Sequence, residues 1–115
     1  MRRSQREVVF EVRRGRLVRH VTLANGRGYV QHCTRDVFEQ VACLVAERGE
    51  AGVTTGELWE ALPNLPCTQI SIALAFLKER GVVDVDARRC YAASTTLYED
   101  AMTEFHFLAH VASGS

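Results

Sequence analysis

The feature that most constrains the fold is a pair of short helices on either side of a proline-bounded turn. The tetrapeptide "TTGE" (residues 54–57) fits the S/T-x-x-E capping box, in which side chains satisfy the free backbone amides at a helix start. That helix ends at Pro63, and a further helix follows the "PNLP" turn and ends at Gly81. Its apolar residues recur at the i, i+3, i+4, i+7 spacing of one buried helix face: Ile70, Ala73, Leu74 and Leu77.

The N-terminal third has the pattern of strands and turns. Val8, Phe10 and Val12 alternate with other residues, which is typical of a strand with one buried face. "RRGR" then predicts a turn, and "RLVRHVTL" a second strand. "ANGRG" contains Asn-Gly, a strong hairpin signal because both residues tolerate positive φ, and "YVQH" forms a short third strand. We therefore predict a three-stranded β-meander.

Helices and one hairpin are predicted for the rest of the chain. Thr34 can cap a helix that ends at Gly49. "VVDVDARRCYAAS" predicts two short strands around a turn near residues 86–88. A last helix covers about residues 97–112, and one of its faces holds Leu97, Ala101, Phe105, Leu108 and Ala112.

Length and composition predict one soluble domain. The chain has 115 residues, of which 47% are apolar and 24% charged. No apolar run approaches the roughly 18 residues that span a bilayer. The N-terminus is charged throughout its first apolar run, unlike a secretory signal, so we expect a cytoplasmic protein with no membrane partner. The four cysteines are scattered without a CxxC pair and are expected to be reduced.

Charge is unevenly distributed along the chain. The net charge is zero, but residues 1–36 hold nine arginines against three acidic residues, whereas residues 37–115 hold five basic against eleven acidic ones. The global basic field that is usual in nucleic-acid-binding proteins is therefore missing. A basic surface can form only locally, at the N-terminal end.

Residues 34–94 resemble a winged-helix domain. The stretch "VTTGELWEALPNLPCTQISIALAFLKERGVVDVDARRCYAA" is similar to winged-helix transcription regulators from their second helix through the wing. The shared features are a capped helix, a polar turn, a helix with an IS-x-x-L-x-x-L pattern, an E-R-G-V-V exit and a hairpin. The resemblance implies an α+β fold. An N-terminal three-stranded β-meander (1–33), unusual in such regulators, precedes the winged-helix core (34–94), and an additional C-terminal helix (95–115) follows it.

In this family the helix after the turn lies in the major groove of DNA. The resemblance therefore implies a small transcriptional regulator that binds double-stranded DNA as a dimer. Contacts to bases or phosphates would come from Thr68, Gln69 and Ser71 near the start of that helix. Arginines on the predicted turns would hold the DNA backbone, and these are Arg13, Arg14, Arg16, Arg88 and Arg89. The helix itself offers an apolar outer face and Glu79, which neutralise no phosphate.

A second resemblance lies in the order of the elements. Three strands followed by three helices are similar to the winged-helix peptide-recognition domains that serve enzymes modifying ribosomally made peptides. In those domains a peptide adds as a strand beside the third strand and packs on the third helix. The resemblance implies docking along the strand edge from Tyr29 to His32 and on an apolar helix face of Ile72, Ala75 and Phe76. The alternative function is thus a protein- or peptide-binding module without DNA binding, and it stays open whether the chain itself covers that face.

The last helix has an apolar face broad enough to predict a homodimer. The residues assigned to that interface are Leu97, Met102, Phe105 and Leu108. His106 and His110 stand at i, i+4, but Phe107 replaces the glutamate of the H-E-x-x-H motif, so no metal site is predicted. No catalytic constellation stands out, and we expect neither enzyme activity nor a cofactor.

Overall fold

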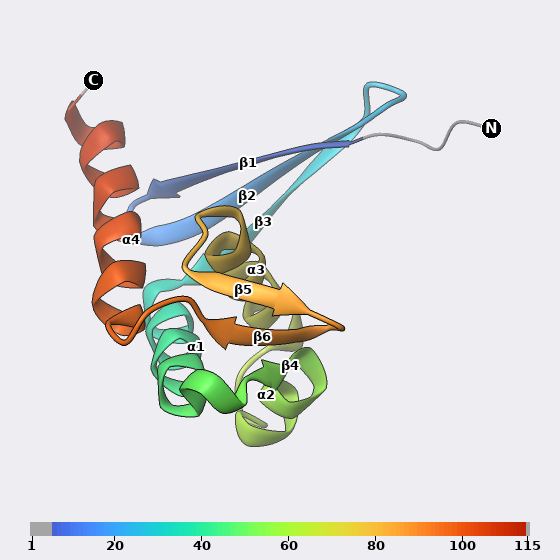
Figure 1. Ribbon diagram of the computed structural model, residues 1–115. Coiled ribbons are helices and arrows are strands. Elements are labelled where there is room, and N and C mark those ends of the chain that lie inside the picture. The colour runs from blue at the N-terminus through green and yellow to red at the C-terminus, as the bar shows by residue number, and fades with distance from the viewer. Residues whose placement is uncertain (1–5, 115) are drawn as a thin grey trace.

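The computed structural model describes the backbone of residues 6–114 and the side chains of residues 7–111. Within this range the chain is a mixed α/β protein with four α-helices and two small antiparallel sheets (Figure 1). The N-terminal sheet has the order β1-β2-β3, formed by β1 (Arg6–Arg13), β2 (Arg16–Leu23) and β3 (Gly28–Thr34). The predicted β-meander is therefore confirmed.

The remaining elements include one strand that the sequence pattern did not predict. This strand, β4, has only two residues and pairs with β6, which gives the second sheet the order β4-β6-β5. The elements after β3 are α1 (Arg35–Arg48), a 3₁₀ turn (Gly49–Ala51), β4 (Val53–Thr54), α2 (Thr55–Ala61), α3 (Cys67–Glu79), β5 (Val83–Asp86), β6 (Arg89–Ala92) and α4 (Leu97–Gly114).

The helix starts are set by the capping residues that the sequence predicts. The Thr34 hydroxyl oxygen accepts a hydrogen bond from the Val37 amide at 3.2 Å and begins α1. At α2, Thr54 and Glu57 each accept a hydrogen bond from the other's backbone amide at 3.1 Å, which completes the capping box. Gly49 ends α1 with a φ of +49°. Local sequence therefore decides where these helices lie.

Two arginines occupy left-handed backbone positions at hairpin tips. The β1–β2 turn contains Arg14 (φ +54°) and Gly15 (φ +77°), and the β5–β6 turn contains Ala87 (φ +51°) and Arg88 (φ +71°). Two-residue hairpin turns favour positive φ at both central residues, where Asn and Gly are the usual choices. A side chain with a Cβ costs about 1–2 kcal/mol in this conformation, so both arginines are held at a conformational cost.

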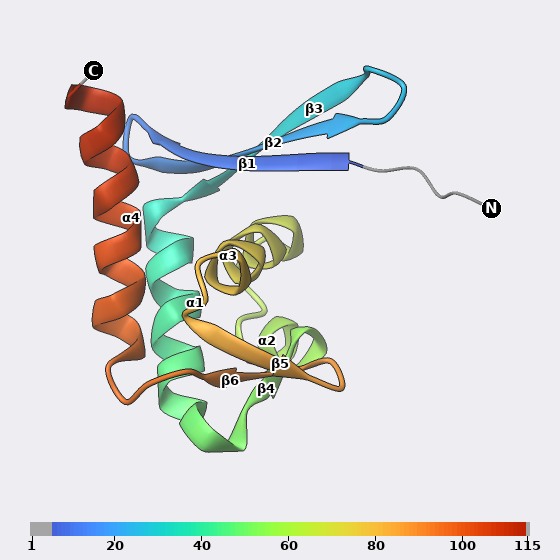
Figure 2. The ribbon, with the colours of Figure 1, turned by 45° about the horizontal axis from the view of Figure 1, so that its top comes forward.

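Helix α3 is packed on two sides (Figure 2). One side carries the predicted stripe of Ile70, Ala73, Leu74 and Leu77, which are all buried. The other side lies under the N-terminal sheet, where the rings of Phe10 and Phe76 meet edge-to-face with centroids 5.3 Å apart. Phe38 of α1 also meets Phe76, at 5.6 Å. The N-terminal sheet and the helices thus share one core.

The outward orientation inferred from sequence for Ile72 and Phe76 is wrong. Both side chains are 0% exposed, and Ala75 is half-buried. The sequence predicts one buried stripe on this helix, but the N-terminal sheet covers a second stripe and excludes water from it. The apolar ridge is therefore core, and it offers no surface to DNA or to a protein partner.

Helix α4 completes this core. Leu97, Met102 and Phe105 are buried against the same chain, and the ring of Phe105 stacks on Phe38 with centroids 5.1 Å apart. Their assignment to a dimer interface is therefore wrong, and Leu108 is half-buried against the same core. The side chain of Ala112 lies outside the described residues. Within residues 6–114, no helix has the length and apolar character needed to cross a membrane.

Candidate functional site

Strand β3 forms an edge of the N-terminal sheet and has free backbone groups there. At the turn between β2 and β3, the Leu23 amide donates to the Arg27 carbonyl at 2.7 Å, and this bond fixes which residues of β3 bond to β2. The backbone N–H and C=O groups of successive residues alternate between the two sides of a strand. The register therefore directs the backbone groups of Tyr29, Gln31 and Cys33 towards β2. Val30 and His32 then direct their N–H and C=O groups away from β2, and these groups have no partner among the described residues.

The backbone groups of Thr34 also point away from β2, and their partner shows what lies beside the edge. Its amide donates to Oε1 of Gln69, on the first turn of α3, at 3.0 Å. The free edge of β3 therefore runs beside α3, and the Gln69 side chain closes its far end. Tyr29 and Val30 are 42% and 49% exposed. We call the outward backbone groups of Val30 and His32, with these two exposed side chains, the β3 edge.

The α3 residues that remain outside the core form a narrow stripe. Thr68 is exposed, and Ser71 and Ala75 are half-buried. Lys78 and Glu79, also exposed, follow towards the helix end. Helix α3 therefore presents small and polar side chains, with Gln69 already bonded to Thr34, rather than a full face.

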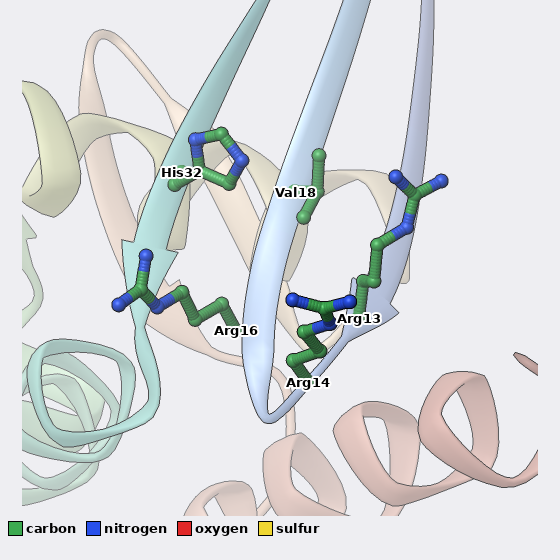
Figure 3. Close-up of a pocket in the computed structure, with 5 residues that line it drawn as sticks. All are labelled: Arg13, Arg14, Arg16, Val18 and His32. Carbon is green, nitrogen blue, oxygen red and sulfur yellow. The ribbon is translucent and has the colours of Figure 1, made fainter. Parts of the chain in front are cut away.

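A basic pocket lies on the opposite face of the sheet (Figure 3). Its volume is about 510 Å³, and it is lined by Arg13, Arg14, Arg16, Val18 and His32. Arg16 and His32 lie on the side nearer β3, whereas Arg13 and Arg14 belong to β1 and the hairpin turn, with Val18 between. Val18 is only 2% exposed although it does not belong to the main core, so it forms an apolar floor.

Glu11 neutralises only part of this positive charge. Its carboxylate bonds to His20, and it also accepts a hydrogen bond from Arg13 at 3.0 Å. The His20 hydrogen bond is the main cause that lowers the pKa of Glu11, and Arg13 adds to the effect. The side chains of Arg14, Arg16 and His32 form no hydrogen bond or ion pair with any part of the chain that the structure describes. An anion can therefore be held here.

In the β5–β6 hairpin, one arginine side chain bonds to other residues of the chain. Arg89 binds both carboxylate oxygens of Glu57, at 3.0 and 3.1 Å, and donates to the Gly52 carbonyl at 3.2 Å. This pairing lowers the pKa of Glu57. These contacts of Arg89, which is predicted from sequence to contact DNA, tie β6 to the start of α2. Arg88, at the tip, is exposed.

The predicted site residues fall into separate places. Arg13, Arg14 and Arg16 share the basic pocket, whereas Arg88 lies on the other sheet. Thr68 and Ser71 lie on α3, on the side of the sheet opposite the basic pocket. His32 is predicted from sequence only as part of the docking strand (29–32), not as a member of the basic pocket, although its alternation with the buried Cys33 indicates an outward position on β3.

Metal and thiol chemistry have little support. The described residues contain no group of three or more His, Cys, Asp or Glu side chains placed to hold a metal. His106 and His110 are exposed on α4. Cys33 is buried, which raises the pKa of its thiol to about 12, and Cys90 is also buried. All four cysteines are free thiols.

Comparison with known proteins found no match for this chain among protein-family models, curated proteins or solved structures. The features of the molecule that bear on its function are therefore the β3 edge, the exposed stripe of α3 and the basic pocket.

Proposed function

We propose that this chain is a winged-helix protein that binds an extended segment of a partner protein. The segment adds as a fourth strand beside β3 and packs against the stripe of α3. The observation that carries the proposal is the β3 edge, where Val30 and His32 direct unpaired backbone groups outward beside a helix. An unpaired edge strand is a ready template for another strand.

The side chains of such a segment would alternate between two environments. One set would face the α3 side of the sheet, near Tyr29 and the Thr68–Ser71 turn of α3. The other set would face the side of Val30 and His32. Backbone hydrogen bonds supply affinity in this mode, and the alternate side chains supply specificity. The edge has room for a short segment only, because Gln69 already occupies the position beyond His32.

Reading of DNA by α3 has less support than peptide binding. In the major-groove mode the outer face of this helix must reach base edges. Here the N-terminal sheet covers Ile72 and Phe76, and Gln69 is bonded to the Thr34 amide. The exposed stripe that remains carries Lys78 as its only basic residue among the described ones. These observations favour the peptide-binding alternative.

Removing one outward amide tests the proposal. Val30→Pro deletes an edge donor and keeps the β2–β3 ladder bonds, because proline is tolerated on an edge strand. The probe is a phage library of random 12-residue peptides, selected on the full chain and followed by synthesis of the enriched peptides. We expect Val30→Pro to weaken their binding at least about tenfold through a lost hydrogen bond and the bulk of the ring.

Val30→Ala is the matched control, since it keeps the amide and removes only the side chain. We expect it to change the peptide affinity by less than about threefold, consistent with a minor apolar contact at an exposed position. Circular dichroism and urea unfolding establish that both variants fold. Peptides that bind Val30→Pro as tightly as the wild type would refute strand addition at β3.

DNA binding remains a second candidate through a different surface. Arg14 and Arg16 on one hairpin and Arg88 on the other are exposed, as phosphate-binding residues must be. Binding to random-sequence duplex DNA, titrated across salt concentration, tests this candidate. A steep loss of affinity with salt would support phosphate neutralisation by these arginines, and no binding at low salt would eliminate it.

A further inference from the structure

We propose that the segment bound at β3 is acidic, with an Asp or Glu side chain that reaches the basic pocket. The inference rests on the proposed function, because it describes which segment the β3 edge accepts. One bound segment would then contact both the β3 edge and the basic pocket. The basic pocket is thus the specificity element, and the backbone groups of β3 are the docking element.

The register places the pocket within reach of an added strand. On the face that holds the pocket, Glu11, Val18 and His32 lie in one row across the three strands, and Arg13, Arg16 and Thr34 lie in the next. A fourth strand would continue the His32 row with a side chain on the same face. Figure 3 shows the Arg16 side chain on the β3 side of the pocket, nearest that position.

The charge of this face is unbalanced in favour of an anion. Glu11 is the only acidic residue in the two rows, and it already binds Arg13 and His20. Arg14 and Arg16 have no acidic partner in the described residues, and they flank the apolar floor at Val18. A carboxylate on the added strand would complement these guanidinium groups. A basic side chain at the same position would be repelled.

The hairpin turn places Arg14 at the pocket. Arg14 has a φ of +54° at a position where Asn or Gly is favoured. The turn holds the Arg14 side chain on the pocket side, together with Arg16.

A charge reversal tests the inference. The same library of 12-residue peptides is selected on the wild type and on Arg16→Glu, with Arg88→Glu as the control that makes an equal charge change on the other sheet. For the wild type and Arg88→Glu we expect enrichment of Asp or Glu at one strand position. For Arg16→Glu we expect that enrichment to disappear and Lys or Arg to replace it. In the wild-type peptide, Glu→Gln at this position should weaken binding about tenfold.

The possible outcomes separate the two proposals. Peptides that depend on the Val30 amide but show no acidic preference, and bind Arg16→Glu equally well, would overturn the acidic specificity and leave strand addition intact. Peptides that are insensitive to Val30→Pro would overturn both. Duplex DNA binding that Arg16→Glu abolishes, without any acidic preference among the peptides, would assign the pocket to phosphates and overturn the inference.

Discussion

Glu57 has two structural roles that meet in one carboxylate. It completes the capping box of α2 by accepting from the Thr54 amide, and it binds the guanidinium of Arg89 on β6. The first role is local and visible in "TTGE". The second joins residues 32 positions apart, and no sequence pattern announces it. The pair links the second sheet to the helices beside it.

This pair predicts a pH-dependent contribution to stability. The folded state lowers the pKa of Glu57, mainly through the Arg89 hydrogen bond. The contribution is therefore fully present above the ordinary Glu pKa and is lost as pH falls through the lowered value. We expect Arg89→Met to be less stable than the wild type in urea at pH 7, and the difference to shrink as the pH falls below the ordinary Glu pKa and Glu57 protonates. Arg88→Met serves as the control. A difference between Arg89→Met and wild type that stays constant with pH would exclude the pairing.

At the scale of elements, α3 decides how the two parts of the chain fit together. Its predicted stripe contacts the helical part, and its opposite side contacts the N-terminal sheet through Phe76. A helix apolar on more than one side is buried rather than amphipathic. The run "ISIALAF" is consistent with that rule, because every second residue is large and apolar.

Truncation of Phe76 tests this packing. Phe76→Ala should lower the free energy of unfolding by about 3–5 kcal/mol, because it opens a cavity between the sheet and two helices. Phe107, which is 54% exposed on α4, provides the control. We expect Phe107→Ala to stay within about 0.5 kcal/mol of the wild type in urea unfolding. A similar, small effect for both variants would contradict the burial of Phe76 under the sheet.

At the scale of the whole molecule, α4 packs beside the end of β1 and closes the core. Phe105 stacks on Phe38 of α1, and α4 lies beside β1 (Figure 1). The broad apolar face of α4, from which a homodimer is predicted, is thus largely buried against the same chain. Phe107 and Val111 remain exposed on α4.

Concentration dependence distinguishes a core residue from an interface residue. We expect Phe105→Ala to lower the free energy of unfolding by about 3–5 kcal/mol through loss of core packing. The fall in Tm, measured by differential scanning fluorimetry at ~5 and ~200 μM protein, should be equal at both concentrations. If Phe105 lay in a dimer interface, the wild-type Tm would rise with concentration and the variant Tm would not.

Much of the secondary structure could be predicted from the sequence, because its determinants are local. The caps at Thr34 and Thr54, the stop at Gly49 and the Asn-Gly turn each act on neighbouring backbone groups. The candidate site was predicted less well. The arginines of the first hairpin share a pocket as a consequence of strand alternation, but the roles of Gln69 and Arg89 depend on partners 35 and 32 residues away.

The sequence alone determined the helices, the β-meander and the buried stripe of α3, since periodicity and capping depend on residues within a few positions of one another. Only the tertiary structure decided which second face of α3 is covered, where the face of α4 packs, and that the end of β3 lies beside α3. These outcomes depend on long-range packing, in which apolar surfaces of several elements compete to exclude water. The spacing of Ile72 and Phe76 in the sequence allows them to face either solvent or the core. They are buried because the N-terminal sheet covers them.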